Sequence, residues 1–435
     1  MTVVFFANIE WRYHDHKEGG KYLSKRTVSV VGGCSWLNEF NPQKFVETQV
    51  RQIKRFVGRE KALVAVSGGV DSTTSAILTY KAIGDNLVCV MLDDAFMREG
   101  EAQYIAQLAS KPPIRLPIRI LNVQEQFLNA LDGLKDAEEK RKAFRETFYN
   151  ILGRTAEKEE CRVLVQGTIK ADIVETAGGV KTQHNVLEQI GINTVERYGF
   201  KVVEPLVSLY KDQVRIVAKY LEIPLEISDR QPFPGPGLSV RVVGKITGEK
   251  LDSVKKATVI VERNFARHKP SQYFPAIIED NKIPHASCMH IKETAARVLN
   301  VPSRHVTVQI FEAKATGVKD GKRMYGGVAS LKIQNETGNL YNPSMSNLVA
   351  LQTKITSGDP YFTRILYLLK EVPKRLPYVV ILRAIQTQDF LTAKVADIPW
   401  NTLNETADMI LDSCKNVSAI YYDVTSKPPA TVEME

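Results

Sequence analysis

Long hydrophobic runs are missing from this sequence. Hydrophobic residues make up 44% of the 435 positions, yet no run approaches the ~20 consecutive apolar residues that a membrane-spanning helix needs. The opening residues, MTVVFFANIEWRYHDHKEGG, lack the basic start and the apolar stretch of a signal peptide. We therefore expect a protein that neither crosses a membrane nor carries an export signal.

Cysteine is scarce as well. The spacing that would indicate a disulfide framework or a zinc site is absent, because no two cysteines form a CxxC pair. A few scattered cysteines are typical of a reduced, cytoplasmic protein. The five are Cys34, Cys89, Cys161, Cys288 and Cys414.

Concentrated basic charge is the third absence. The net charge is +9, but the chain has no long block of Lys and Arg and no basic run interleaved with aromatic residues. Those features are typical of nucleic-acid-binding proteins, so we expect no nucleic-acid partner. A diffuse positive excess also suits a protein that binds phosphorylated metabolites.

Short apolar segments alternate with helical patterns through the first half of the chain. Such alternation predicts an α/β fold with a doubly wound parallel sheet, in which ligands bind at the carboxyl ends of the strands. A helix is expected to precede the first strand from Asn41 onward. The expected strands are residues 61–66, 86–92, 117–123, 161–167 and 201–206.

The composition of the sequence changes at the stretch RQPFPGPGL (230–238). Its prolines and glycines exclude a regular helix, so we expect a domain boundary there. The predicted domains are 41–235 and a smaller α+β domain, 236–435. In the second, we expect helices at 250–265 and 406–416 and strands at 377–385 and 418–424. Residues 1–40 are an extension of unknown role.

The sequence SGGVDS (67–72) follows the first expected strand and opens a helix. N–H groups at a helix N-terminus attract anions, and glycines let the backbone approach them closely. The hydroxyls of Ser67 and Ser72 can donate to phosphate oxygens, and Asp71 suits a helix cap or a metal ligand. An ordinary capped turn is the alternative. The Lys of the Walker-type loop is missing.

SGGVDS resembles the signature of the PP-loop ATP-pyrophosphatases. The resemblance implies that this loop holds the β,γ-pyrophosphate of ATP while a substrate oxygen is adenylylated. The same loop occurs in NAD synthetases, GMP synthetases, argininosuccinate synthetases and tRNA-modifying enzymes, so it does not choose among them.

Longer motifs resemble the GMP synthetase family over roughly residues 41–263 and 379–435. In that family the O2 of xanthosine monophosphate (XMP) attacks the α-phosphate of ATP, and ammonia then displaces AMP to give GMP. The resemblance implies ATP with Mg²⁺, and a dimerisation domain that forms a homodimer. The motifs are QGTIKADIVET (166–176), VKTQHNV (180–186), EPLVSLYKDQVR (204–215), RQPFPGPGLSVRVVGKIT (230–247), LRAIQTQDFLTA (382–393) and YDVTSKPPATVEME (422–435).

The resemblance also implies roles for individual residues. The catalytic residues are Asp71, Asp172 and Lys211; the two aspartates are Mg²⁺ ligands and Lys211 supplies the positive charge that the loop lacks. ATP and its pyrophosphate are bound by Val66, Ser67, Gly68, Gly69, Val70, Asp71, Ser72, Leu92, Asp93 and Gly167. XMP is bound by Arg98, Arg230, Lys427, Thr431 and Glu433.

Several features depart from the family pattern. No amidotransferase signature is present, so ammonia is expected from solution or from a separate glutaminase subunit. Residues 264–378 are expected to contain an insertion, and TGVKDGKRMYGG (316–327) carries an Asp-Gly pair in reversed order. Four substitutions relative to the family are Lys170, Ala171, Gln183 and Met434.

These substitutions leave other functions open. A degenerate paralogue that binds nucleotide or regulates a partner is one, and an NAD synthetase-like amidating enzyme is another. A tRNA modifier fits the charge but lacks a catalytic cysteine pair. For the chain end we expect Val432 and Met434 to be buried in a partner subunit.

Overall fold

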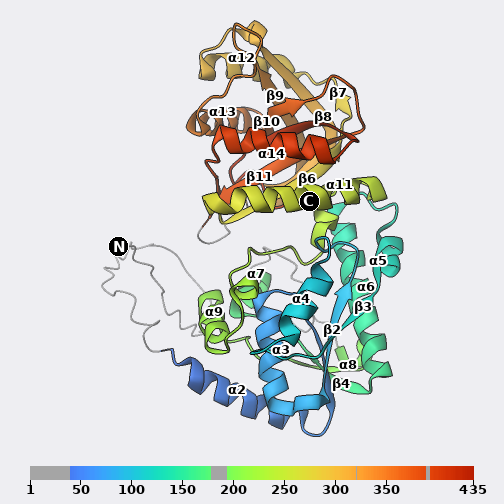
Figure 1. Ribbon diagram of the computed structural model, residues 1–435. Coiled ribbons are helices and arrows are strands. Elements are labelled where there is room, and N and C mark those ends of the chain that lie inside the picture. The colour runs from blue at the N-terminus through green and yellow to red at the C-terminus, as the bar shows by residue number, and fades with distance from the viewer. Residues whose placement is uncertain (1–39, 178–193, 320, 388–391) are drawn as a thin grey trace, which may run out of the picture.

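The computed structural model describes residues 40–177, 194–319, 321–387 and 392–435. These residues form two domains that meet around the linker at 230–238 (Figure 1). No helix within the described ranges is both long and apolar enough to cross a membrane.

A five-stranded parallel sheet organises the first domain and confirms the expected fold class. Its strand order is β3-β2-β1-β4-β5. The central strands are buried along most of their length, as expected for strands with helices on both faces. The strands are β1 (Lys61–Ala65), β2 (Leu87–Asp93), β3 (Ile118–Asn122), β4 (Cys161–Val165) and β5 (Lys201–Val203).

Helices cover both faces of this sheet (Figure 1). One hydrophobic core includes residues of α2, α3, α4 and α9, whereas α5 and α6 pack into another. The expected helix after Asn41 is confirmed: the Asn41 side chain accepts the N–H of Lys44 at 2.9 Å, and Gly58 caps the C-terminus of the helix. The helices are α2 (Pro42–Val57), α3 (Val70–Ile83), α4 (Glu101–Ser110), α5 (Gln124–Leu131), α6 (Ala137–Lys158), α7 (Lys170–Ala177), α8 (Thr194–Tyr198), α9 (Lys211–Tyr220) and α10 (Leu225–Ser228).

The strand order reverses between β1 and β4. These two strands are adjacent and run parallel to each other, although about a hundred residues separate them in the sequence. Their carboxyl ends lead into Val66–Gly69 and Gln166–Ile169 respectively. Such a switch point is where open α/β sheets bind ligands, because the two connections diverge to opposite faces.

The linker packs against the first domain. Gly237 has a φ of +59°, and a Cβ there would lie 2.8 Å from the Cβ of Phe96, so glycine is required. The N–H of Leu238 donates to the carbonyl of Phe96 at 2.8 Å. A short 3₁₀ turn (Gly237–Val240) then leads toward α11 (Gly248–Phe265).

An eight-stranded mixed sheet forms the second domain. Strand β10 pairs parallel with β9 and antiparallel with β13, and β11 pairs parallel with β13 and antiparallel with β6. The strands are β6 (Gln272–Glu279), β7 (Lys282–Ile283), β8 (Val306–Lys319), β9 (Lys322–Ile333), β10 (Phe362–Glu371), β11 (Tyr378–Gln386), β12 (Lys394–Val395) and β13 (Val417–Asp423); the remaining helices are α12 (Ser287–Leu299), α13 (Met345–Gly358) and α14 (Trp400–Ser413).

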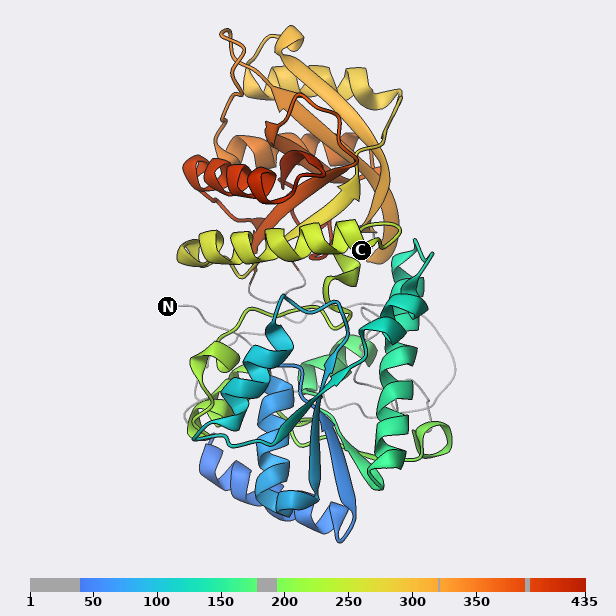
Figure 2. The same cartoon turned by 45° about the vertical axis from the view of Figure 1, so that its right-hand side comes forward.

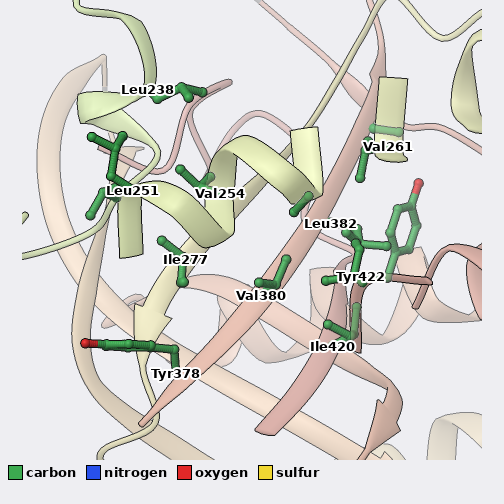
Figure 3. Packing of buried hydrophobic residues seen from close by; sticks show 14 of the residues in the cluster. Leu238, Leu251, Val254, Val261, Ile277, Tyr378, Val380, Leu382, Ile420 and Tyr422 are labelled. Carbon is green, nitrogen blue, oxygen red and sulfur yellow. The ribbon is translucent and has the colours of Figure 1, made fainter. Parts of the chain in front are cut away.

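Helix α11 lies across this sheet and buries its apolar face there. Figure 3 shows Val254 and Val261 of α11 facing the side chains of Val380 and Leu382 on β11. All four are 0% exposed, and burying each is worth roughly 1.5–3 kcal/mol. The segment 264–378 contributes β6 to β10 to the same sheet, so it forms part of the domain core.

Candidate active site

The loop after β1 is closed by the side chain of Ser72. Its Oγ accepts the N–H of Ser67 at 3.1 Å, lies 3.0 Å from Ser67 Oγ and donates to the carbonyl of Gly69 at 3.2 Å. The chain then enters α3 at Val70. The first N–H groups of a helix have no intrahelical acceptor, so the start of α3 is a potential anion site.

Two glycines let three segments meet at this loop. Gly68 has a φ of +78°, and a Cβ there would lie 2.9 Å from Cγ1 of Ile105 in α4. A Cβ on Gly167, after β4, would lie 2.9 Å from the backbone of Asp71 and Ser72. The end of β4 therefore lies directly against the start of α3, which places both predicted glycines at the switch point.

Lys211 reaches the loop from a distant part of the sequence. Its Nζ lies 2.5 Å from Oδ2 of Asp71, 140 residues away. Lys211 is the first residue of α9, and the two side chains are 39% and 28% exposed. The structure thus brings a positive charge to the loop where the sequence lacks the Walker lysine.

The other oxygen of Asp71 suits a magnesium ion. Oδ1 is buried and has no hydrogen-bond partner. Proteins hold Mg²⁺ through one or two carboxylates together with phosphate oxygens. Within the described ranges, no group of three or more His, Cys, Asp or Glu residues could hold a metal ion.

Asp172 lies on α7, beyond the end of β4. Its Oδ2 accepts the N–H of Ile169 at 3.0 Å, which ties the carboxylate to the chain leaving β4. Lys170 starts the same helix, and its Nζ lies 4.9 Å from the ring centre of Tyr210, the residue before Lys211. The substituted position 170 therefore lies beside Lys211. Gln183 lies outside the described residues.

Two of the residues predicted to bind ATP belong to the hydrophobic cores. Val66 is 1% exposed and Leu92 6% exposed, and they pack in the two different cores of the first domain. Asp93 ends β2, and its carbonyl accepts the N–H of Val123 at 3.0 Å. Their contact with ATP stays a prediction.

Arg98 and Arg230, predicted to bind XMP, share one carboxylate. Oε1 of Glu101 lies 3.0 Å from Nη1 of Arg98 and 2.6 Å from Nη1 of Arg230. Arg98 also contacts Glu262 of α11 at 2.7 Å. This cluster bridges the first domain, the linker and the second domain.

Phe233 of the linker connects this cluster to Glu433. The guanidinium carbons of Arg98 and Arg241 lie 4.2 and 4.9 Å from the centre of its ring. Arg241 in turn donates from Nε and Nη2 to the two oxygens of Glu433, each at 3.0 Å. Three of the five residues predicted to bind XMP, namely Arg98, Arg230 and Glu433, are therefore linked through this ring and its neighbours.

Two fully buried arginines hold the chain end. Arg364 donates to Thr431 Oγ1 at 2.9 Å, and Arg383 donates to the carbonyls of Thr431 and Val432, each at 2.8 Å. Both arginines contact the same oxygen of Asp423, at 2.9 and 2.7 Å. The N–H of Lys427 donates to the carbonyl of Ala393 at 2.8 Å.

The expectation that Met434 is buried in a partner subunit is wrong. Met434 is 0% exposed within this chain and packs with residues such as Phe311 and Tyr421 of its own sheet. The next residue, Glu435, is held by Lys140 of the first domain at 2.5 Å. In Figure 2 the chain end lies beside α11 and near the start of α6.

Comparison with known proteins matches both domains. Residues 42–226 match the PP-loop domain, and residues 369–434 match the GMP synthase C terminal domain. One subunit of the glutamine-hydrolyzing GMP synthase of Sulfurisphaera tokodaii is 43% identical over 91% of this chain and 100% of its own length. The corresponding subunit of Methanopyrus kandleri is 36% identical over the same shares. The chain belongs to the family of these GMP synthase subunits.

Membership of this GMP synthase family settles the choice that the loop left open among PP-loop enzymes. The chain is a ligase that forms a carbon–nitrogen bond. A solved structure of NMN synthetase from Francisella tularensis is 18% identical, with a TM-score of 0.36 over 46% of this chain and 79% of that one. That likeness adds nothing to the assignment.

Sequence reasoning missed several residues of the site. Arg241, Arg383 and Asp423 lie inside motifs shared with GMP synthetases, so the motifs were a signal, although nothing in them separated these residues from their neighbours. Lys140 stands in the charged segment EEKRK of α6, where an exposed lysine is the ordinary expectation. Its complete burial depends on Glu435, which no local pattern reveals.

Proposed function

We propose that this chain is the ATP-pyrophosphatase subunit of a GMP synthase. It transfers the adenylyl group of ATP to O2 of XMP and releases pyrophosphate. Ammonia then attacks C2 of the purine, AMP leaves, and GMP is formed. The Asp71–Lys211 pair at the start of α3, in a chain related along its length to a GMP synthase subunit, is the observation that carries the proposal.

The loop and Lys211 are assigned to the leaving pyrophosphate. The N–H groups at the start of α3 and the ammonium of Lys211 face the charge that grows on the β-phosphate as its bond to the α-phosphate breaks. Mg²⁺, bound with ATP, neutralises charge on the phosphates when present. Asp71 would hold the ion through Oδ1, while Oδ2 keeps Lys211 in place. Asp172 is assigned as a second ligand.

The cluster at the linker is assigned to XMP. Arg98, Arg230 and Glu433 gather at the junction of the two domains. Arginine guanidinium groups suit a nucleotide phosphate, and a carboxylate suits donors on a purine or ribose. Lys427 and Thr431 complete the set on the chain end.

The source of ammonia is assigned to a second protein. The relatives are each named as one subunit of a glutamine-hydrolyzing enzyme, which supports a separate glutaminase subunit. We also assign a homodimer and a cytoplasmic location, the latter supported by four cysteines without disulfides in the described ranges.

An assay with ATP, Mg²⁺, XMP and ammonium tests the proposal. We expect loss of XMP absorbance together with release of pyrophosphate and AMP in equal amounts. Glutamine in place of ammonium should give no turnover until a glutaminase subunit is added. Absence of XMP-dependent turnover at high ammonium would show that the proposal is wrong and favour a degenerate paralogue.

A further inference from the structure

We propose that Glu101 is a positioning residue of the XMP site, a buried carboxylate that aims the guanidinium of Arg230 at the nucleotide. The inference rests on the proposed function, which places Arg230 at XMP. Glu101 is the first residue of α4, and its side chain is 4% exposed. A carboxylate at a helix N-terminus interacts favourably with the helix dipole.

Both oxygens of Glu101 are engaged by the two arginines. Oε2 accepts the backbone N–H of Arg98 at 2.9 Å. Oε1 faces Nη1 of Arg98 at 3.0 Å and Nη1 of Arg230 at 2.6 Å. Hydrogen bonds between charged groups are strong and directional, so the carboxylate has one orientation and imposes it on Arg230.

The two arginines differ in how much of the guanidinium group is exposed. The side chain of Arg98 is 7% exposed, and its Nε and Nη2 face Glu262 at 2.8 and 2.7 Å. Arg230 directs Nη1 to Glu101 and is 23% exposed. Arg98 therefore holds Glu101 in place, and Arg230 has the more exposed guanidinium of the two assigned to XMP.

The linker fixes the backbone next to Arg230, so the orientation of the Arg230 side chain depends on Glu101. Arg230 stands at the start of RQPFPGPGL, where its neighbour Gln231 donates to Glu262 at 2.9 Å and accepts the N–H of Tyr273 at 3.1 Å. These contacts fix the backbone at 231 but not the long side chain of Arg230. Glu101 supplies the missing restraint, which lowers the entropy lost when XMP binds.

Replacing Glu101 with glutamine tests the positioning role. In Glu101→Gln we expect the KM for XMP to rise about tenfold, because the charge that orders Arg230 is gone, while kcat and the KM for ATP change less than about twofold. Glu99→Gln is the matched control, since Glu99 is exposed on the same loop and none of the ion pairs among the described residues joins it to Arg98 or Arg230; there the KM for XMP should change by less than about twofold.

Arg230→Gln separates this inference from the proposed function. If Arg230→Gln leaves the KM for XMP unchanged, the assignment of the nucleotide site is wrong. If it raises the KM but Glu101→Gln does not, or Glu99→Gln acts as strongly as Glu101→Gln, the positioning role alone is wrong. In the double variant Glu101→Gln/Arg230→Gln, the KM should match that of Arg230→Gln. Should Glu101→Gln fail to fold, Glu101→Asp keeps the charge and should give a smaller rise in the KM.

Discussion

The two carboxylate oxygens of Asp71 have different surroundings. Oδ2 holds Lys211, whereas the buried Oδ1 has no hydrogen-bond partner. A buried acceptor without a donor costs free energy unless a ligand satisfies it. The pair is partly exposed, so its own contribution to stability is small, at about 1 kcal/mol or less. The pair therefore contributes little to stability, which agrees with the catalytic role proposed for these residues.

Lys211→Ala should remove adenylylation without unfolding the protein. Loss of one preorganised charge at a developing anion lowers rates by about a hundredfold or more. The measurement is XMP-dependent exchange of labelled pyrophosphate into ATP, which reports the first half-reaction alone. Lys170→Ala is the control, because Lys170 is exposed and its ammonium group lies near the ring of Tyr210, the residue before Lys211. Normal exchange by Lys211→Ala would refute the assigned role.

Ionisation of Asp94, in the loop after β2, makes the stability of the protein depend on pH. Burial, with the charges of Asp93 and Glu101 adding to it, raises the pKa of Asp94 from 3.8 to about 7, against the opposing hydrogen bond from the N–H of Phe96. The folded protein thus binds a proton that the unfolded chain releases. The free energy of unfolding therefore falls as pH rises between about 4 and 7, by about 1.4 kcal/mol for each unit of pKa difference.

Asp94→Asn should remove this loss of stability. Asparagine keeps an acceptor for the N–H of Phe96 but cannot ionise. We expect the melting temperature of the variant, relative to the unchanged protein, to be higher at pH 8 than at pH 5. Asp85→Asn, at an exposed aspartate before the same strand, should give the same difference at both pH values. Equal behaviour of the two variants would contradict the assignment.

At the scale of elements, the first domain was largely predictable. Each of its strands is a short apolar run between helices, and a run such as residues 61–66 is continuous because helices bury both faces of the sheet. The second domain was less predictable. Strand pairing there joins β6 to β11 across about a hundred residues, and no local pattern encodes which distant strand is the partner. The insertion expected within residues 264–378 rests on the length of that segment relative to the family and stays a prediction.

The chain end depends on three charges inside the second domain. Asp423, Arg364 and Arg383 stand on three strands and are 0% exposed, and the two arginines hold the Thr431 hydroxyl and the carbonyls of Thr431 and Val432. Two buried cations that share one anion leave an uncompensated charge if the anion is removed. Sequence alone offered Asp423 as one acidic residue in a motif.

Asp423→Asn should lower the free energy of unfolding by about 3–5 kcal/mol. Urea unfolding followed by circular dichroism measures the change. The matched control is Asp408→Asn, which breaks the pair with Lys370 on the surface, where the two side chains are 49% and 46% exposed; we expect a change of about 1 kcal/mol or less. Similar losses in the two variants would show that the buried trio does not stabilise the domain.

At the scale of the whole molecule, the two domains share a core and a buried ion pair. One hydrophobic cluster runs from Phe127 and Phe144 in the first domain to Leu238 and Val254 beyond the linker. Lys140 and Glu435 are 0% and 2% exposed, and Lys140 also donates to the carbonyl of Val242 at 2.7 Å. The position of the first domain is thereby tied to the same chain end that carries Glu433.

Lys140→Met should uncouple the two domains. Adding Glu435→Gln to Lys140→Met should restore much of the lost stability. Lys140→Met leaves Glu435 buried without a cation, which costs about 3–5 kcal/mol, whereas removing both charges avoids that cost. Calorimetry should show one unfolding transition in the unchanged protein and two in Lys140→Met, because each domain keeps its own sheet. The KM for XMP should rise in Lys140→Met and recover in part in the double variant. Additive destabilisation in the double variant would mean that the pair does not join the domains.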